Sequence, residues 1–203
     1  MTLPMGVTPA FALDLDANGL GDVWEARYHA SGLLASDDTD GDGQTNAAES
    51  IAGTDPRGPT SRHTVTIEMN GTVISLTAQT QPGKKYQVVS GPSPSGPWTP
   101  VGAPHVATAL GDHVFTPGPE GPLAFYRVTV SDTDSDNDGV NDWSELQLSG
   151  FNPQETTSFP SASAGNDLAI ATSMVQGWRN NALTVATTAA AAYEKENEPA
   201  VVT

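Results

Sequence analysis

Cysteine is absent from the 203-residue chain, which excludes disulfides, zinc sites built on thiolates and thiol chemistry. Positive charge is scarce, because eight Lys and Arg stand against 24 Asp and Glu, for a formal net charge of −16. Since eight scattered cations form no patch, the composition excludes a nucleic-acid partner. No apolar run approaches the roughly 20 residues that cross a bilayer, so no membrane-spanning segment is predicted.

The chain also lacks the short motifs of common catalytic sites. It contains no nucleophile elbow, phosphate-binding loop or HExxH zinc motif. Pairs of carboxylates can hydrolyse glycosides, but the acidic residues of this chain follow a metal-binding spacing. We therefore predict that the protein is not an enzyme. Its histidines are isolated along the sequence and not at metal-ligand spacing; they are His29, His63, His105 and His113.

Acidic residues are what the chain has in excess, and the segment 38–49 (DTDGDGQTNAAE) holds four of them at a regular spacing. Asp38, Asp40 and Asp42 alternate, Gly43 follows where the chain must turn sharply, and Glu49 ends the segment. Ca²⁺ prefers about six to eight oxygen ligands at ~2.3–2.6 Å. A short loop directs alternate side chains inward when a glycine relieves the bend. The spacing therefore predicts an EF-hand-like calcium loop.

The same pattern occurs three times, in loop 1 (14–25), loop 2 (38–49) and loop 3 (134–145). Positions 1, 3 and 5 supply side-chain oxygens, position 7 a backbone carbonyl, position 9 a direct or water-mediated ligand, and position 12 a bidentate carboxylate. Solvated Asp-Gly turns explain the enrichment in Asp and Gly, but not a Glu three residues after position 9 in every copy. The predicted ligands are Asp14, Asp16, Asn18, Leu20, Asp22 and Glu25 in loop 1; Asp38, Asp40, Asp42, Gln44, Asn46 and Glu49 in loop 2; and Asp134, Asp136, Asp138, Val140, Asp142 and Glu145 in loop 3.

These ligands include thirteen of the 24 acidic residues, so three bound Ca²⁺ would bring the net charge to about −10. Without the ions, the clustered carboxylates would repel one another and loosen the loops. The predicted cofactor is therefore about three Ca²⁺, in a structural role. Signalling EF-hands open a Met-rich groove between paired helices, whereas the four Met of this chain are not arranged on a helix face.

A short helix is predicted directly after each loop, with none before it. The second of these helices, at about 45–52, is ended by Gly53 and Pro56. The segment 38–56, DTDGDGQTNAAESIAGTDP, resembles bacterial thrombospondin type 3 repeats, and the resemblance extends over 13–56 and 132–153. Such repeats, like dockerin repeats, keep the calcium loop and the exiting helix but lack the entering helix. The resemblance implies calcium at the ligands named above, and somewhat weaker sites where Asn18 and Asn46 replace Asp.

Residues 57–131 are predicted to form β-strands. Asn70-Gly71 between two alternating apolar runs, 63–69 and 72–76, predicts a hairpin with a type I′ turn. Further strands are predicted at 85–90, 98–101, 106–110, 113–116 and 125–130, at the spacing of a small sandwich. The stretches around Tyr86, Trp98 and Tyr126 resemble fibronectin-type-III-like modules of bacterial surface proteins. We expect those three aromatic residues, with Phe115, to form the core rather than a carbohydrate platform.

The two ends of the chain leave alternatives open. Residues 1–12 (MTLPMGVTPAFA) fit either the remnant of a secretory signal or an N-terminal arm. A short helix is predicted at 168–178. Beyond it, residues 183–203 resemble the opening strands of a Calx-beta-like domain, which would make the chain a fragment of a longer surface protein or require strand completion by another subunit. An Ala-rich helix over 182–195 is the alternative.

The sequence therefore predicts a mainly β fold, a small antiparallel β-sandwich flanked by EF-hand-like calcium loops with short exiting helices. Its parts are the N-terminal segment 1–12, the first two loop-helix repeats at 13–56, the sandwich at 57–131, the third loop-helix repeat at 132–153 and the C-terminal segment 154–203. Loop 3 is expected to pack on the end of the sandwich. We expect a secreted or cell-surface structural or adhesion protein. The alternatives are a fibre or surface-layer subunit that associates with copies of itself, and a carbohydrate-binding accessory module of a secreted enzyme.

Overall fold

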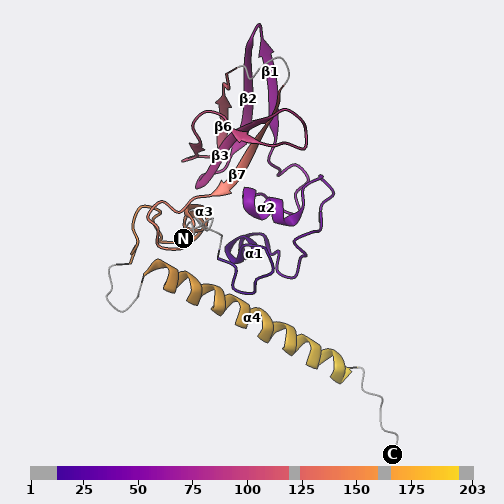
Figure 1. Cartoon of the computed structure of the whole chain (residues 1–203). Helices are drawn as coiled ribbons and strands as arrows, with labels where there is room; N and C mark the ends of the chain where they lie inside the picture. Colours follow the sequence, from indigo (N-terminus) through magenta and orange to yellow (C-terminus); the bar gives the residue numbers. More distant parts are fainter. Residues whose placement is uncertain (1–12, 119–123, 160–165, 197–203) are drawn as a thin grey trace, which may run out of the picture.

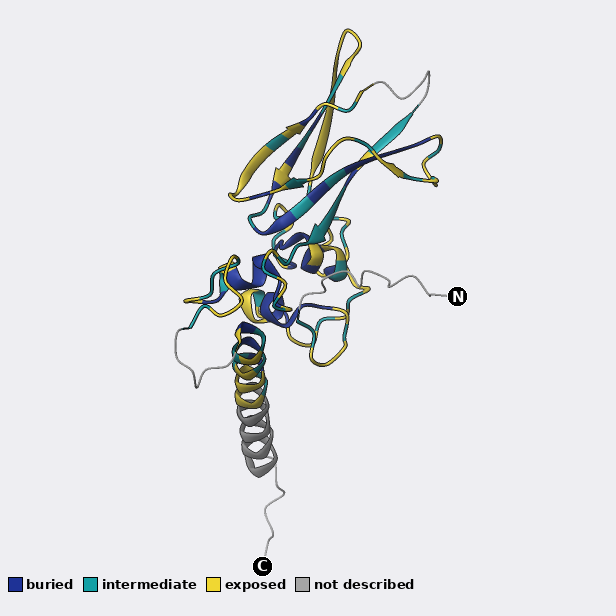
Figure 2. Cartoon of the chain, turned by 60° about the vertical axis from the view of Figure 1, so that its left-hand side comes forward, coloured by how far each residue is buried: buried dark blue, intermediate teal, exposed yellow. Residues whose placement is uncertain are grey.

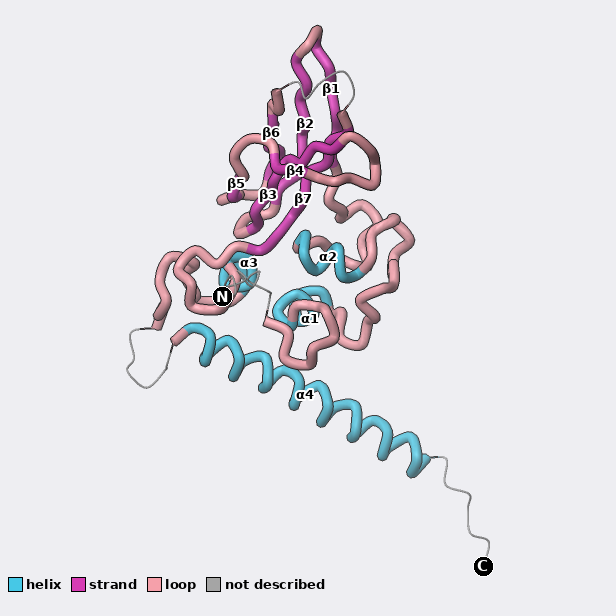
Figure 3. Tube along the Cα trace, viewed as in Figure 1, coloured by secondary structure: helices cyan, strands magenta, loops and turns pink. Residues whose placement is uncertain are grey.

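A computed structural model describes residues 13–118, 124–159 and 166–196, with side chains as far as Asn181. The predicted N-terminal arm or signal remnant, residues 1–12, lies outside these residues. The β-sandwich occupies one end of the molecule, three short helices lie in the middle, and a long helix runs along the opposite side (Figures 1 and 3). The calcium-type loops are therefore held between the sandwich and the long helix.

The sandwich consists of two antiparallel sheets, which confirms the predicted mainly β, sandwich-like fold. The first sheet has the order β1-β2-β6. In the second sheet β3 is central, with β7 on one edge and the short β4 and β5 on the other. The strands are β1 (Val65–Asn70), β2 (Val73–Thr80), β3 (Lys84–Gly91), β4 (Thr99–Pro100), β5 (His105–Val106), β6 (Gly111–Phe115) and β7 (Phe125–Asp132).

The predicted hairpin between β1 and β2 is present, but the predicted type I′ turn is wrong. Asn70 belongs to β1 and pairs with Val73, so the turn residues are Gly71 and Thr72. Gly71 has a φ of 62°, but Thr72 is not among the residues with positive φ. A type I′ turn requires positive φ at both central residues, whereas a type II′ turn requires it at the first. The turn therefore lies one residue later than predicted, and the observed register pairs Ile67 with Leu76 and Met69 with Ile74.

Most of the predicted aromatic core of the sandwich is confirmed, and Figure 2 marks the buried stretches of its strands in dark blue. Tyr86 and Phe115 are buried, and Tyr126 packs against the cluster that they form. Trp98 lies outside this cluster, so its assignment to the core is wrong. The guanidinium of Arg127 instead lies 4.2 Å from the centre of the Trp98 ring, which is the arrangement of a cation–π contact.

The three short helices begin at position 9 of their loops. They are α1 (Asp22–Tyr28), α2 (Asn46–Ala52) and α3 (Asp142–Gln147). The helix α2 ends at Gly53, whose φ of 74° places it in the left-handed region, as predicted. In α1, Trp24 and Tyr28 stack edge to face with ring centres 5.9 Å apart. Their polar atoms donate to the carbonyls of Thr54 and Gly53, so the first two loop-helix units pack as a pair.

The long helix α4 (Asp167–Glu196) covers the predicted helix at 168–178 and continues well past it. The interpretation of 183–196 as strands is therefore wrong, and the Ala-rich helix forms instead; residues 197–203 lie outside the description. Alanine has the highest helix propensity, which outweighs the β-branched residues that suggested strands. Among the described helices, none is both long and apolar enough to cross a membrane.

Two separate apolar clusters divide the molecule, one inside the sandwich and one among the loops and helices. The second cluster joins Leu20 and Trp24 of the first loop-helix unit to Val140 and Trp143 of the third, and to Val175 of α4. The loops thus share a core that the sandwich does not supply.

Loop 3 packs on the end of the sandwich, as predicted. Lys84, the first residue of β3, is fully buried and pairs with Asp132 at the end of β7. Its ammonium lies 4.9 Å from the centre of the Trp143 ring. Gly83 approaches the same residue so closely that a Cβ there would lie 2.5 Å from the backbone nitrogen of Trp143. This contact fixes loop 3 against the strands.

Candidate metal sites

The three loops share one backbone geometry. The amide of position 9 donates to the carbonyl just before the loop, at 2.7 Å for Asp22, 2.7 Å for Asn46 and 2.9 Å for Asp142. The position-1 carboxylate accepts from the amide of the position-6 glycine, at 2.9 Å in loop 1, 2.9 Å in loop 2 and 3.0 Å in loop 3. These bonds close each loop on itself and direct its remaining side chains inward.

In loop 2 the carboxylates converge on one point. Oxygens of Asp38, Asp40 and Asp42 lie within 4.8 Å of one another. In Asp40 and Asp42, one oxygen accepts a backbone amide of the loop, at 3.2 Å and 2.8 Å. The second oxygen of each is buried and has no hydrogen-bond partner within the described residues, and the same holds for Oε2 of Glu49. Three inward-facing carboxylates thus carry oxygens without a donor.

Loop 3 repeats this arrangement. Oxygens of Asp134, Asp136 and Asp138 lie within 4.8 Å of one another. The amides of Asp138 and Val140 bond one oxygen each of Asp136 and Asp138, at 3.2 Å and 2.8 Å. The second oxygens of these two aspartates, and both oxygens of Glu145, are buried and unpartnered in the part of the chain that the structure describes.

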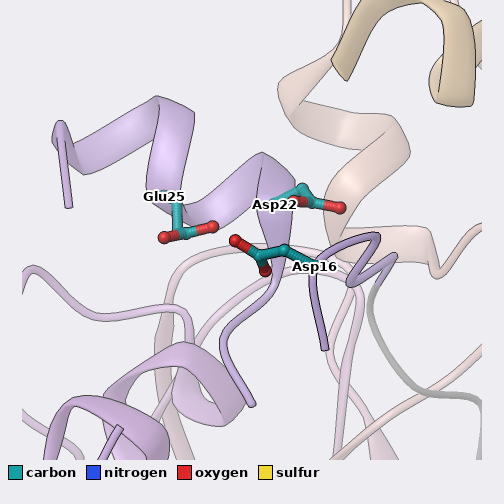
Figure 4. A group of neighbouring side chains, drawn as sticks. All are labelled: Asp16, Asp22 and Glu25. Carbon is teal, nitrogen blue, oxygen red and sulfur yellow. The ribbon is translucent and has the colours of Figure 1, made fainter. Parts of the chain in front are cut away.

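Loop 1 differs, because protein groups already bond its carboxylates. Asp16, Asp22 and Glu25 gather within 4.8 Å (Figure 4). The side-chain amide of Asn18 donates to Glu25 at 3.1 Å. Arg179 of α4 pairs with Asp16 and, at 2.6 Å, with Asp22. A cation entering loop 1 must therefore compete with the Arg179 guanidinium, which predicts the weakest binding at this loop.

Burial changes the acidity of the position-12 carboxyls. It raises the pKa of Glu25 to about 7, that of Glu49 to about 7 and that of Glu145 to about 8. Neighbouring loop carboxylates add to the rise, since one negative charge disfavours another nearby. The pKa of Asp138 rises to about 6 for the same two reasons. A divalent cation bound among these carboxylates would instead lower their pKa values.

The ligands predicted at positions 7 and 9 are placed less directly. The side chains of Leu20 and Val140 are buried in the helical core, and the Gln44 amide donates to the carbonyl of His63 at 2.9 Å. The backbone carbonyls of Leu20, Gln44 and Val140 as calcium ligands therefore remain a prediction. At position 9, each side chain bonds residue 2 of its own loop: Asp22 accepts from Leu15, Asn46 from Thr39 and Asp142 from Ser135.

Three features were outside the reach of the sequence pattern. Asp167 and Arg179 on α4 contact loop 3 and loop 1, but neither has a spacing that links it to a loop. His105 and His113, eight residues apart in the sequence, stack with ring centres 3.6 Å apart. Within the described residues this histidine pair belongs to no group of three or more potential ligands, so it forms no candidate metal site.

Comparison with known proteins identifies one of the loops. Residues 38–56 match the family of the bacterial TSP3 repeat. This match covers loop 2 and its exiting helix, and it supports the thrombospondin type 3 resemblance there. The fibronectin and Calx-beta resemblances receive no such support. No curated protein and no solved structure matches the chain.

The TSP3 repeat family binds calcium, and the clustered carboxylates of loops 2 and 3 fit this ion. Calcium prefers hard, anionic oxygens, and both loops present buried oxygens of that kind with no donor among the described residues. A buried carboxylate without a partner is costly. The residues that would hold the ion are the inward-facing aspartates and the position-12 glutamate of each loop.

Proposed function

We propose that the protein is a calcium-binding, extracellular structural or adhesion module in which the ions rigidify the base of the β-sandwich. The observation that carries this proposal is the set of unpartnered, buried carboxylate oxygens in loops 2 and 3. Glu49 and Glu145 are both fully buried, and a full negative charge in such a place needs a cation. An extracellular location suits the proposal, because calcium is abundant there and can replace disulfides as a staple.

The ion does not need to open a binding surface in this account. Trp143 follows Asp142 of loop 3 and packs against both Gly53, which ends α2, and Gly83 of the sandwich. Ordering loop 3 therefore orders the junction between the two cores. About three ions are proposed, with loop 1 the weakest because of Arg179.

Calcium titration of the purified, chelator-treated chain tests this function. Isothermal titration calorimetry is expected to show binding in the wild type, and Glu49→Gln and Glu145→Gln are each expected to remove one site. The amide cannot act as an anionic bidentate ligand, so a loss of about tenfold or more in affinity is expected at the mutated loop. Glu68→Gln is the control, since Glu68 is an exposed acid on β1. Unaltered binding in both loop variants would refute the proposal.

A second candidate function, self-association into a larger surface assembly, is favoured by the edge strand β1. Every residue of β1 is exposed, including Ile67 and Met69 at 60% and 72%. Ile67 pairs with the buried Leu76, so it lies on the sheet face that continues the core. An exposed apolar edge strand is a template for pairing with another chain.

Light scattering over a range of protein concentrations tests the assembly. Mass is expected to rise with concentration in the presence of calcium, and Ile67→Lys is expected to abolish the rise. Thr66→Lys places the same charge on the opposite face of β1 and should leave the association intact. A constant monomer mass at every concentration would remove this candidate.

A further inference from the structure

The helix α4 brings a carboxylate to loop 3 that the loop pattern does not contain. Asp167, the first residue of α4, is fully buried. Oxygens of Asp167, Asp138 and Glu145 lie within 4.8 Å of one another. Two ligands of one Ca²⁺ lie at most about 5 Å apart when each bond is ~2.4 Å. A single ion can therefore contact all three side chains.

The hydrogen bonds of Asp167 leave it free to coordinate. Ser158 is its partner, and the Ser158 amide lies 2.9 Å from one carboxylate oxygen and 3.0 Å from the other. The Ser158 hydroxyl also bonds the second oxygen. An ionised carboxylate offers about four lone-pair sites, so sites remain. The helix is capped by another residue, because Asn166 accepts the amide of Ala169 at 3.1 Å.

Loop 3 also leaves carboxylate oxygens next to Asp167 without a partner. Both oxygens of the fully buried Glu145 have no donor within the described residues. The second oxygen of Asp138 is likewise buried and unpartnered there. Asp167 gathers with these same two residues, so a cation among them would have three carboxylates as ligands.

We propose that Asp167 is a calcium ligand of loop 3, contributed by α4, so that the ion itself fastens the start of this helix to the loop. The proposal rests on the proposed function, because it requires loop 3 to bind calcium. The second polar anchor of α4 is Arg179 on loop 1, about 18 Å farther along the helix. The helix is thus held by an ion-mediated contact at one end and an ion pair farther along.

The test uses the full chain with Glu25→Gln and Glu49→Gln, so that loop 3 is the remaining loop with its position-12 carboxylate. In this background Asp167→Asn is expected to lower calcium affinity about tenfold or more, while its side-chain oxygen can still accept the Ser158 amide and its NH2 group can donate to the Ser158 hydroxyl. Ser158→Ala removes the hydroxyl donor to Asp167 but keeps the backbone amide donor and the charge of Asp167, and is expected to change affinity much less. Glu155→Gln is the charge control, because Glu155 is exposed in the segment before α4.

A second measurement reports on the start of α4 directly. In the wild-type chain, calcium is expected to slow hydrogen exchange of the α4 amides after Asp167, and Asp167→Asn is expected to abolish this slowing. If calcium binds and Glu145→Gln removes the site, but Asp167→Asn binds like the background, the inference fails and the proposed function stands. If the background chain binds no calcium at all, loop 3 is not a site and the inference fails, while calcium binding by the wild-type chain decides the proposed function separately. Slowed exchange that persists in Asp167→Asn also overturns the inference.

Discussion

Chelation of calcium at about pH 8 is expected to lower the unfolding temperature by on the order of 10 °C or more. An ion that binds only the folded state at a concentration of about a thousand times Kd stabilises it by roughly 4 kcal/mol per site. For a chain of this size, about 1 kcal/mol corresponds to roughly 2–4 °C. Differential scanning calorimetry with calcium and with EDTA measures the shift, and readdition of calcium is the control for reversibility.

The drop in unfolding temperature on chelation should be smaller at about pH 6. The direction of this change follows from the pKa values of the buried carboxyl groups. Burial and neighbouring carboxylates raise the pKa of Glu49 to about 7 and that of Glu145 to about 8 in the ion-free loops. A raised carboxyl pKa contributes stability that is present below the ordinary pKa of 4.5 and is lost as pH rises through the folded value. The ion-free protein should therefore become more stable on acidification, while protons compete with calcium.

Glu145→Gln separates this explanation from a general pH effect. The variant lacks the titrating carboxyl, so the stability of its ion-free form should depend less on pH between about 5 and 8 than that of the wild type. An unfolding temperature that is unchanged by EDTA at both pH values would contradict the role of calcium. An equal EDTA effect at both values would contradict the pKa argument.

Gly83→Ala is expected to destabilise the protein by about 3 kcal/mol or more, because two penalties coincide. Gly83 has a φ of 76°, and an L-residue in the left-handed region costs about 1–2 kcal/mol. The new Cβ would also lie 2.5 Å from the backbone nitrogen and 2.7 Å from the Cα of Trp143. Backbone cannot yield as a flexible side chain does, so overpacking adds roughly 1–3 kcal/mol.

Gly71→Ala provides a matched control for this prediction. Gly71 has a φ of 62°, yet nothing lies within 4 Å of a Cβ added there. It should therefore show the conformational penalty alone. Urea unfolding of both variants in calcium measures the difference, which reports the contact between the sandwich and loop 3. Equal losses in the two variants would show that this contact does not support the fold.

The sequence by itself determined the features whose causes are local. The three loops follow from ligands at fixed spacing within twelve residues, because a short closed loop leaves its side chains few directions. The exiting helices and the stop at Gly53 follow from capping and backbone conformation in the same way. Alternating apolar residues predicted the strands of the sandwich, since the core and the strand period together define which face is buried.

Tertiary structure decided whatever depends on two distant segments meeting. No spacing rule connects Asp167 to Glu145 or Arg179 to Asp16, because the packing of α4 against α1 and α3 sets both contacts. The burial of Lys84 beneath Trp143 likewise needs the sandwich and loop 3 to be placed together. The local spacing of acidic residues and glycine predicted where the calcium-type loops form. Long-range packing decided how far the carboxylates of each loop are paired with protein groups. In loop 1 they are paired with Arg179 of α4, whereas in loop 3 buried oxygens are left without a partner among the described residues.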